Sequence, residues 1–506
     1  MSRPHRFLAA LVSGALLALA FPDAGIGLLS LVALAPLIAA VLRSSGPLEA
    51  FFLGLAGSLV TWLVNVPWVI HVMVRYGGLS MPVGVSLYLL LSLVLAAYGG
   101  LFALLVRRMR AVHPTMFWFL APAAWTAIEL LRTYLLTGFS WNLLAVALID
   151  ETPLVMAARV IGPYGVGFLA MVPATILGWI AATEGKPKLK RTAAIAGAAL
   201  VLAWWGSGAL MLRSIAPRAG EPFRAVMLQP NISQEMRWEA GTTLELFGKM
   251  MRMTAEAGRE GATTIVWPES TVPLTFVAHE LYRESVAAAS AELGADVILG
   301  SVAEDPDDPS RLWNAAYLVH RGELRGRYDK IHLVPFGEYV PLRKVLFFAE
   351  KLVRAVGEFQ FGTNERPLEG WHRYGPAICY EIVFPQIPRR QVLNGADVLV
   401  TITNDGWFGG SGAPRQHLDA ARLRAVETDR WLLRAATSGI SALVDPAGRL
   451  VDSIPMNREG IIVGEPTARQ STTAYVRFGD WFAWLAALAT AIAAARPQLG
   501  KVGNDG

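Results

Sequence analysis

The hydrophobic and polar positions divide the chain into two apolar stretches on either side of one mixed stretch. A helix needs roughly 20 apolar residues to cross the hydrocarbon core of a bilayer. Most of the apolar runs meet this need: 7–21, 26–42, 51–74, 80–106, 115–135, 163–182, 193–212 and 478–495. The pattern predicts a polytopic helical membrane domain of seven spans at 1–213, and an eighth transmembrane helix with a short cytoplasmic tail at 478–506.

The region 214–477 has a different pattern of hydrophobic and polar residues. Short runs rich in β-branched residues alternate with helix-like segments, and the strand-like runs are apolar on both faces. This pattern predicts an α/β domain whose sheets are covered by helices. Gly-bearing turns within 318–330 and 444–454 predict hairpins, so the sheets are expected to be mixed.

Composition places part of the chain in lipid. Hydrophobic residues make up 54% and charged residues 17% of the 506 residues, which is too apolar for a water-soluble enzyme of this length. The net charge of +5 lies mostly in loops beside the apolar runs. It therefore indicates membrane topology and excludes nucleic acid as the expected partner.

The basic residues also predict an orientation. When the runs are joined alternately, most Lys and Arg fall on one side, with clusters at 107–110 and 186–191 and further residues near both termini. By the positive-inside rule this side is cytoplasmic, so the 214–477 domain emerges on the outer side. In a bacterium this predicts a multi-pass inner-membrane protein with a periplasmic domain.

Two alternatives concern the helical part. The first run has the outline of a cleavable signal peptide, but another apolar run follows almost at once, which favours a retained helix. A transporter would carry polar groups at mid-span or paired interrupted helices. The polar residues of these runs lie near run ends or in the 136–162 connection and are interpreted as interfacial: Asn65, His71, Glu129, Arg132, Asn142 and Asp150.

Three strand ends carry groups whose chemistry fits together. Cys379 is the only cysteine and suits either a buried small hydrophobe or a nucleophile. Glu269 follows an apolar strand, and a partly desolvated carboxylate can act as a base near neutral pH. A fixed ammonium at Lys330 can stabilise an oxyanion and favour a thiolate. Taken singly, each residue also has an ordinary structural role. His332 has no companion at ligand spacing, so no metal is expected.

Four motifs then occur in order: VWPES around Glu269, YDKIHLVPFGEYVP around Lys330, CYEIVFP around Cys379, and NDGWFG at 404–409. Together they resemble the nitrilase superfamily with its Glu-Lys-Cys triad. With seven apolar runs before the domain and one after it, the full length resembles the apolipoprotein N-acyltransferase family. The resemblance implies an αββα four-layer sandwich for the nitrilase-like catalytic domain at 214–477.

The resemblance further implies a two-step reaction. Cys379 would take an acyl chain from a membrane phospholipid as a thioester and pass it to the N-terminal amine of the diacylglyceryl-cysteine of an apolipoprotein. Glu269 would move the protons and Lys330 would steady the oxyanion. The thioester carries the activation, so no cofactor is needed. The enzyme is expected to work in the membrane as a monomer.

Supporting roles are implied for four further residues. Glu338 would orient Lys330 or share the role of base, while Glu381 and Tyr380 would shape the pocket. Trp238 would contact the substrate.

The surroundings of the motifs suit a lipid substrate. Segment 340–359 is apolar with Lys and Arg residues spaced along it, and it is interpreted either as an amphipathic lid or as an ordinary packed helix. Trp407 and Phe408 would line the acyl pocket or belong to the core.

Two rival functions stay open at this point. A membrane-anchored nitrilase-type amidase would use the same triad to hydrolyse a small amide, although it has no evident need for seven spans. A transporter or lipid-binding scaffold with an inactive domain would need no triad.

Overall fold

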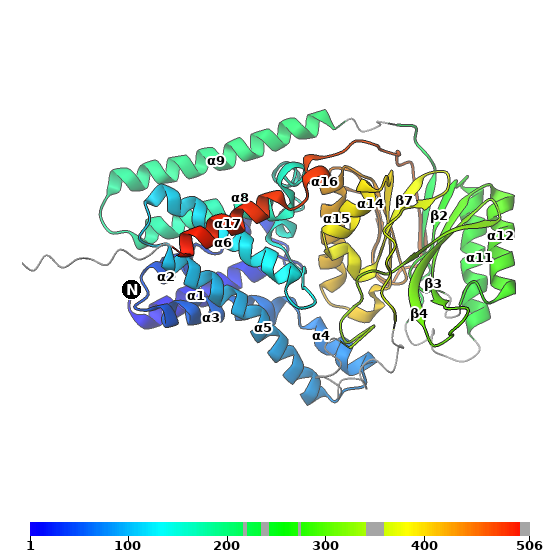
Figure 1. Ribbon diagram of the computed structural model, residues 1–506, viewed down its shortest axis with the longest axis horizontal. Coiled ribbons are helices and arrows are strands. Elements are labelled where there is room, and N and C mark those ends of the chain that lie inside the picture. Colours follow the sequence, from blue (N-terminus) through cyan, green and yellow to red (C-terminus); the bar gives the residue numbers. More distant parts are fainter. Residues whose placement is uncertain (216–219, 234–241, 272–274, 341–358, 496–506) are drawn as a thin grey trace, which may run out of the picture.

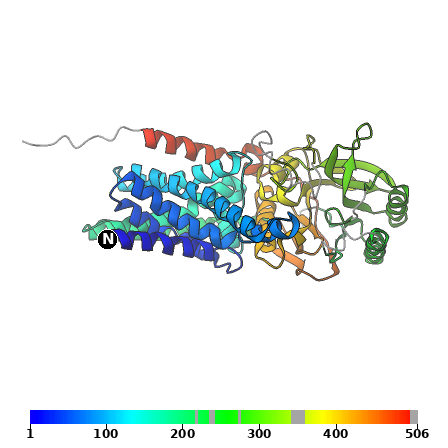
Figure 2. The same cartoon turned by 90° about the horizontal axis from the view of Figure 1, so that it is seen from below.

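The chain forms an elongated molecule with a helical domain at one end and a domain of two sheets at the other (Figures 1 and 2). The computed structural model describes residues 1–215, 220–233, 242–271, 275–340 and 359–495. Trp238 and nearly all of the predicted lid at 340–359 lie outside the described residues.

Each of the predicted apolar runs carries a helix. These helices are α1 (Arg3–Leu19), α2 (Ala35–Leu42), α3 (Pro47–Asn65), α5 (Met81–Arg108), α6 (Pro114–Tyr134), α8 (Ala158–Ala182), α9 (Pro187–Ser214) and α17 (Trp481–Ala495). Among the described helices, α3, α5, α8 and α9 are long and apolar enough to cross a membrane. Short helices α4 (Trp68–His71) and η2 (Val72–Tyr76) follow α3, and η3 (Leu144–Leu148) and α7 (Thr152–Val155) precede α8.

The helices of this domain approach closely through glycine. A Cβ placed on Gly14 of α1 would lie 2.0 Å from the carbonyl oxygen of Gly57 on α3. One on Gly54 of α3 would lie 2.2 Å from the carbonyl oxygen of Gly99 on α5. Because apolar helices gain little from hydrophobic burial in lipid, such close backbone contact is a main source of their association.

The polar residues of the apolar runs lie inside the helical domain. Glu129 and Arg132 on α6 are 2% and 5% exposed, and Asn65 and Asn142 are also buried. They line a cavity of about 50 Å³. These four residues are therefore interior to the protein, because the connection after α6 folds back and covers that helix. Their predicted depth near the membrane interface stays a prediction.

The other domain contains two mixed sheets. The first has the order β12-β1-β2-β3-β4-β5 and the second β11-β10-β9-β8-β7-β6. The strands of the first are β1 (Ala225–Gln229), β2 (Thr264–Val266), β3 (Asp296–Glu304), β4 (Leu312–His320), β5 (Glu323–Asp329) and β12 (Gly460–Gly464). Those of the second are β6 (Leu368–Glu369), β7 (Arg373–Ile378), β8 (Val398–Thr403), β9 (Leu432–Ala436), β10 (Ser441–Val444) and β11 (Leu450–Ile454).

Strand pairing confirms the predicted α/β pattern with mixed sheets. Strands β1, β2 and β3 are parallel to one another, as are β7, β8 and β9. Both predicted hairpins are present, as the antiparallel pairs β4–β5 and β10–β11.

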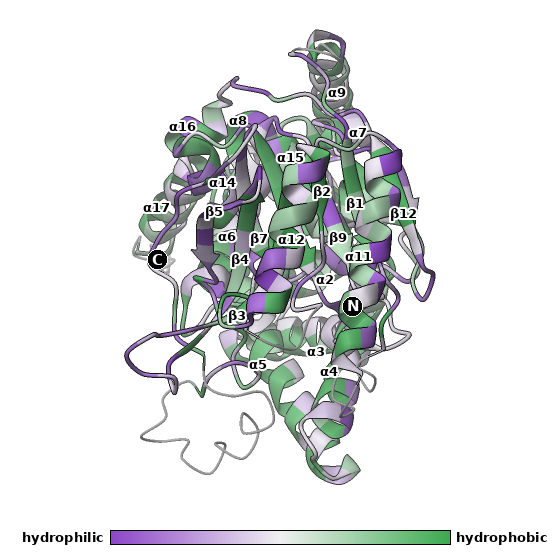
Figure 3. Cartoon of the chain, turned by 90° about the vertical axis from the view of Figure 1, so that its right-hand side faces the viewer, coloured by the Kyte–Doolittle hydropathy of each residue, from purple (hydrophilic) through white to green (hydrophobic). Residues whose placement is uncertain are grey.

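Alternate residues of each buried strand face different neighbours. Met227 of β1 packs in the cluster between the sheets, with Ile378 and Val400 of the second sheet. Val226 packs outward with helices α11 (Thr243–Arg259) and α12 (Glu280–Leu293). These two helices carry hydrophilic residues on the side turned away from the sheet (Figure 3). Strands apolar on both faces, as the sequence indicated, are thus buried on both faces.

A layer of helices joins the outer face of the second sheet to the helical domain. Helices α14 (Gln386–Leu393) and α15 (Ala413–Thr428) lie on this face, and α16 (Ala474–Phe478) lies beside them (Figure 1). Within α15 every residue except Arg415 is buried. One continuous apolar cluster joins Leu399 of β8 and Leu418 of α15 to Met171 of α8. The second sheet is therefore joined to the helical domain through α15.

Candidate active site

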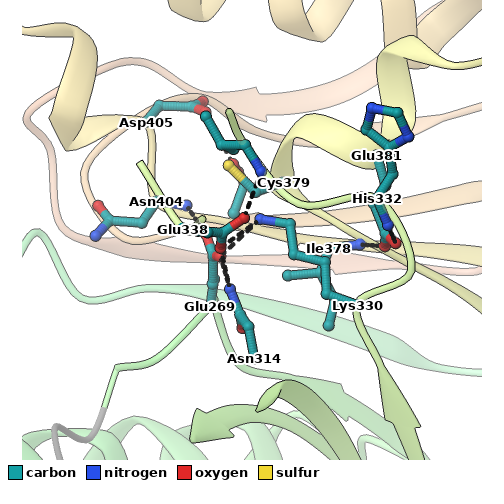
Figure 4. A network of polar contacts seen from close by, with 12 residues as sticks. Glu269, Asn314, Lys330, His332, Glu338, Ile378, Cys379, Glu381, Asn404 and Asp405 are labelled. Carbon is teal, nitrogen blue, oxygen red and sulfur yellow. Dashed lines mark hydrogen bonds and ion pairs between the residues drawn. The ribbon is translucent and has the colours of Figure 1, made fainter. Parts of the chain in front are cut away.

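The three predicted residues meet between the two sheets. Glu269 follows β2 and Lys330 follows β5 of the first sheet, whereas Cys379 follows β7 of the second. Their side chains point toward one another (Figure 4). All three are buried, at 6%, 1% and 7% exposure respectively. The facing strand ends thus bring Glu269 and Cys379 together, although these residues lie 110 positions apart in the sequence.

Lys330 sits between two carboxylates. Its Nζ lies 2.9 Å from Oε1 of Glu338 and 3.7 Å from Oε1 of Glu269. Burial by itself lowers the pKa of Lys330, but Glu338 and Glu269 outweigh this effect and raise the pKa above its ordinary value. The lysine therefore stays an ammonium ion at neutral pH.

An amide bridges the same two carboxylates. Asn314 on β4 donates from Nδ2 to Oε1 of Glu269 at 2.7 Å and to Oε1 of Glu338 at 3.0 Å. Asn314 was not among the residues predicted from the sequence. Its one signal was a single amide in the middle of an otherwise apolar strand, since a buried polar group needs a hydrogen-bond partner.

The remaining carboxylate oxygens fix two loops. Oε2 of Glu269 accepts the N–H of Asn404, which opens the NDGWFG motif, at 3.0 Å. Oε2 of Glu338 accepts the N–H of Val334 at 2.8 Å. Glu338 thus contacts Lys330 and also closes the loop that carries both residues.

Cys379 occupies an unusual backbone conformation. Its φ is 52°, in the left-handed region, and it begins the short helix η5 (Cys379–Val383). Such a conformation costs free energy in a residue with a side chain and is typical of functional positions. Burial and the nearby Glu269 raise the pKa of the thiol, against the opposite effect of Lys330. The resting thiol is therefore protonated at neutral pH and needs a base to become a nucleophile.

Glu381 braces the two sides of the site. Its carboxylate accepts the N–H of Ile378 at 2.7 Å, the N–H of Ile331 at 2.6 Å and the N–H of His332 at 3.1 Å. Burial raises its pKa to about 7, against the opposing effect of these N–H groups. The fully buried Glu381 thus joins the Lys330 turn to the Cys379 turn. Tyr380, in contrast, turns toward the helical domain, where its ring stacks on Trp141.

A buried cluster holds Cys379 from the other side. His417 of α15 has its Nε2 at 2.9 Å from the carbonyl oxygen of Cys379 and its Nδ1 at 2.9 Å from Oδ1 of Asp405. Since a carbonyl only accepts, Nε2 carries a proton. Arg434 of β9 donates to Oδ2 of Asp405 at 2.7 Å. Arg434 and His417 hold the pKa of Asp405 well below its usual range despite burial.

This cluster was only partly visible in the sequence. Asp405 lies in the NDGWFG motif, but His417 is an ordinary member of a predicted helix. Arg434 lies on β9, a strand that was not predicted from the sequence. No spacing rule links them, because their contacts come from the way α15 crosses the second sheet.

The two aromatic residues of the same motif face the helical domain. Phe408 packs on Trp68 of α4 at a ring separation of 4.9 Å, and Trp407 packs on Tyr76 of η2 at 4.8 Å. The helical domain thus packs against the loop whose first residue, Asn404, binds Glu269.

His332 gives a pH-dependence that can be measured. Burial and the adjacent Lys330 lower its pKa from about 6.5 to about 4. Between these values the unfolded chain binds a proton that the folded chain does not, so folding stability rises with pH. The wild type should lose thermal stability as pH falls from 6.5 toward 4. In His332→Gln this decline should be shallower, by about 2–3 kcal/mol over the window.

The measurement is a melting curve at each pH. The exposed His279→Gln is the control and should keep the wild-type slope. An unchanged slope in His332→Gln would contradict the prediction.

Metal chemistry has no evident ligand set in the described part of the chain. Within the described ranges, no group of three or more His, Cys, Asp or Glu side chains could hold a metal ion.

The fold and the site define a carbon-nitrogen hydrolase domain joined to a helical membrane domain. The family model for the carbon-nitrogen hydrolases matches residues 225–474. The model for the apolipoprotein N-acyltransferase N-terminal domain matches residues 13–176. The chain belongs to the apolipoprotein N-acyltransferase family, which is a family of membrane enzymes.

Curated relatives agree over nearly the full length. Apolipoprotein N-acyltransferase of Geobacter metallireducens is 35% identical over 97% of this chain and 95% of its own. That of Methylococcus capsulatus is 34% identical over 94% and 92%, and that of Azotobacter vinelandii is 33% identical over 94% and 92%. Among solved structures, a Nesterenkonia amidase of the nitrilase superfamily covers 52% of this chain and 95% of its own, with 19% identity and a TM-score of 0.40.

Proposed function

We propose that this protein transfers an acyl chain from a membrane phospholipid, through a thioester on Cys379, to the N-terminal amine of diacylglyceryl-cysteine in an apolipoprotein. One observation carries the proposal. A buried thiol, a carboxylate and an ammonium ion converge in a domain whose second sheet rests on apolar helices. This arrangement supplies covalent acyl chemistry next to lipid.

The first step forms the thioester. Glu269 takes the proton of the Cys379 thiol, and the thiolate attacks the carbonyl carbon of the phospholipid ester. The resulting oxyanion is stabilised by the ammonium of Lys330. When the ester C–O bond breaks, Glu269 returns the proton to the leaving oxygen, so a lysophospholipid departs and the acyl chain stays on sulfur.

The second step forms the amide. The neutral α-amine of the lipoprotein cysteine attacks the thioester carbonyl, again beside Lys330. Glu269 accepts a proton from the nitrogen as the C–S bond breaks, and the proton then returns to the thiolate of Cys379. Two bulky lipids can use one site in turn because the acyl group waits on the enzyme between the steps.

Other residues serve these steps indirectly. Glu338 holds Lys330 in place, and Glu381 fixes the relative position of the Lys330 and Cys379 turns. Tyr380 places its ring toward the helical domain and contributes to the pocket wall on that side. Trp238 contacts the substrate in this proposal.

The proposal includes an arrangement in the membrane. The eight apolar runs form eight crossings of a bacterial inner membrane, with the two-sheet domain on the periplasmic side as an αββα sandwich and the protein acting as a monomer. The domains are 1–213, 214–477 and 478–506. The distribution of Lys and Arg supports this orientation.

Mass spectrometry of the intact protein tests the function. Full-length protein in detergent micelles is incubated with phosphatidylethanolamine that carries palmitoyl chains. We expect the mass to increase by one palmitoyl group, and hydroxylamine or a diacylglyceryl-cysteine peptide to remove it. Cys379→Ala should form no adduct.

The other outcomes separate the alternatives. No adduct together with rapid hydrolysis of small amides would favour the amidase. A Cys379→Ala protein that still acylates the peptide would contradict the assignment of the nucleophile.

A further inference from the structure

A buried ion pair in the helical domain has no part in the steps above. Glu129 and Arg132 lie one turn apart on α6, with Nη2 of Arg132 at 3.9 Å from Oε1 of Glu129. Ionisable side chains among apolar helices are costly and mark functional positions by default. The adjoining cavity of about 50 Å³ is large enough for water, which lowers the cost of keeping the pair charged.

Both side chains form hydrogen bonds with the backbone of residues 141–144. Arg132 donates from Nη1 to the carbonyl oxygen of Trp141 at 2.6 Å and from Nη2 to that of Asn142 at 3.4 Å. Glu129 accepts the N–H of Leu144 on Oε1 at 2.7 Å. Asn142 has a φ of 50°, in the left-handed region, which asparagine tolerates better than most residues with a side chain.

The opposite side of this segment presents Trp141 to the catalytic domain. Trp141 is 1% exposed, and its Nε1 donates to Oε1 of Gln416 at 2.6 Å. Its ring stacks on His417 at 5.7 Å and on Tyr380 at 6.3 Å, with interplanar angles of 19° and 21°. One of these partners binds the carbonyl oxygen of Cys379, and the other is the next residue along the chain.

We propose that Glu129 and Arg132 are positioning residues for acyl transfer, which hold Trp141 against His417 and Tyr380 and thereby hold the backbone of Cys379 in its left-handed conformation. The proposal rests on the proposed function, because it concerns the orientation of the same nucleophile. It gives the helical domain a role in the chemistry beyond anchoring.

The first test separates positioning from binding. In Arg132→Gln, which keeps a donor but loses the charge and the fork, we expect kcat for palmitoyl transfer to fall about 10- to 100-fold, since small displacements of reacting groups cost this much. The KM for phospholipid should stay within about twofold because the pair touches no proposed lipid contact. Arg132→Lys should recover part of the rate, since it restores the charge and one donor.

The single cysteine gives an independent readout. Iodoacetamide can alkylate no other thiol in this chain, so its rate reports on Cys379 alone. We expect a change of at least about fivefold in Arg132→Gln, in the same protein preparation that melts near the wild-type temperature. A wild-type alkylation rate together with wild-type kcat would overturn the proposal.

A double-variant cycle tests the route through Trp141. If the pair acts through this ring, adding Arg132→Gln to Trp141→Leu should lower kcat no further. The kcat of the double variant should then equal that of Trp141→Leu within about twofold. Losses that multiply would overturn the proposal. Should Arg132→Gln fail to fold, Glu129→Gln replaces it in the cycle, because the amide oxygen can still accept the Leu144 N–H.

The matched control is another ion pair that links the domains. Arg159 of α8 lies 2.8 Å from Asp429, which retains Arg469 at 3.0 Å when Arg159 is removed. Arg159→Gln should leave kcat and the alkylation rate unchanged, and an equal loss in this variant would contradict a specific role for Glu129 and Arg132. If the wild type forms no acyl adduct, the proposed function fails; if it does and Arg132→Gln matches it, only this inference fails.

Discussion

Glu269→Gln should reduce the rate of Cys379 acylation about a thousandfold, the typical loss when a general base is removed. The amide can no longer take the thiol proton, and the thiol does not ionise unaided, because burial raises its pKa. The rate is measured in a single turnover by intact mass, from the appearance of the palmitoyl adduct. The melting temperature should change far less than the rate.

Glu338→Gln is a closely matched control. Each of the two carboxylates accepts the Asn314 amide, lies beside Lys330 and accepts one backbone N–H. The two substitutions therefore remove similar hydrogen bonds, and only their chemical consequence differs. We expect Glu338→Gln to lower the rate no more than about tenfold, as a residue that orients Lys330. Equal losses would mean that the role of base is shared, and a larger loss for Glu338 would overturn the assignment.

Lys330→Met should lower both the acylation rate and the folding stability. It removes the cation from the oxyanion, which should cost about a thousandfold in rate. It also leaves Glu269 and Glu338 buried without their counter-ion, which should lower the free energy of unfolding by about 3–5 kcal/mol. The measurements are single-turnover acylation and a thermal melt of the same preparation.

A second substitution separates these two effects. Combining Lys330→Met with Glu338→Gln removes one of the stranded charges, so much of the lost stability should return while the rate stays low. Recovery of the rate would contradict the role of Lys330. Lys249→Met is the surface control: its partner Glu459 is 2.6 Å away but about half exposed, so the cost should stay within about 1 kcal/mol.

The convergence of Glu269, Lys330 and Cys379 could be expected from the resemblance of the four ordered motifs to the nitrilase superfamily, although each residue taken singly also had an ordinary structural role. Glu269, Lys330 and Cys379 all stand at the ends of strand-like runs, and strand ends gather at the edge of a sheet, where sites form. The mixed α/β pattern and both hairpins were readable because alternation and turn residues are local signals, whereas the order of the strands in each sheet was not predicted.

The groups that the sequence did not reveal depend on distant contacts. Asn314 meets Glu269 across 45 residues, and His417 reaches the Cys379 carbonyl across 38, through crossings that no periodicity encodes. Glu381 was predicted to shape the pocket, but its contacts with the backbone of two separate turns and with the Tyr328 hydroxyl were not visible in the sequence. Glu129 and Arg132 were interpreted from their position along α6, and only the packing of the next segment shows that they are interior.

The cluster that joins β8 and α15 to α8 has a consequence for how this protein unfolds and evolves. Two parts that share one core cannot melt independently, so heat or denaturant should disrupt the anchor and the enzyme in a single cooperative transition. For the same reason, the two-sheet domain would expose an apolar face if released from its helices. A relative with an unrelated membrane domain would need different residues on the surface of α15. Substitutions on the two sides of this contact should therefore occur together.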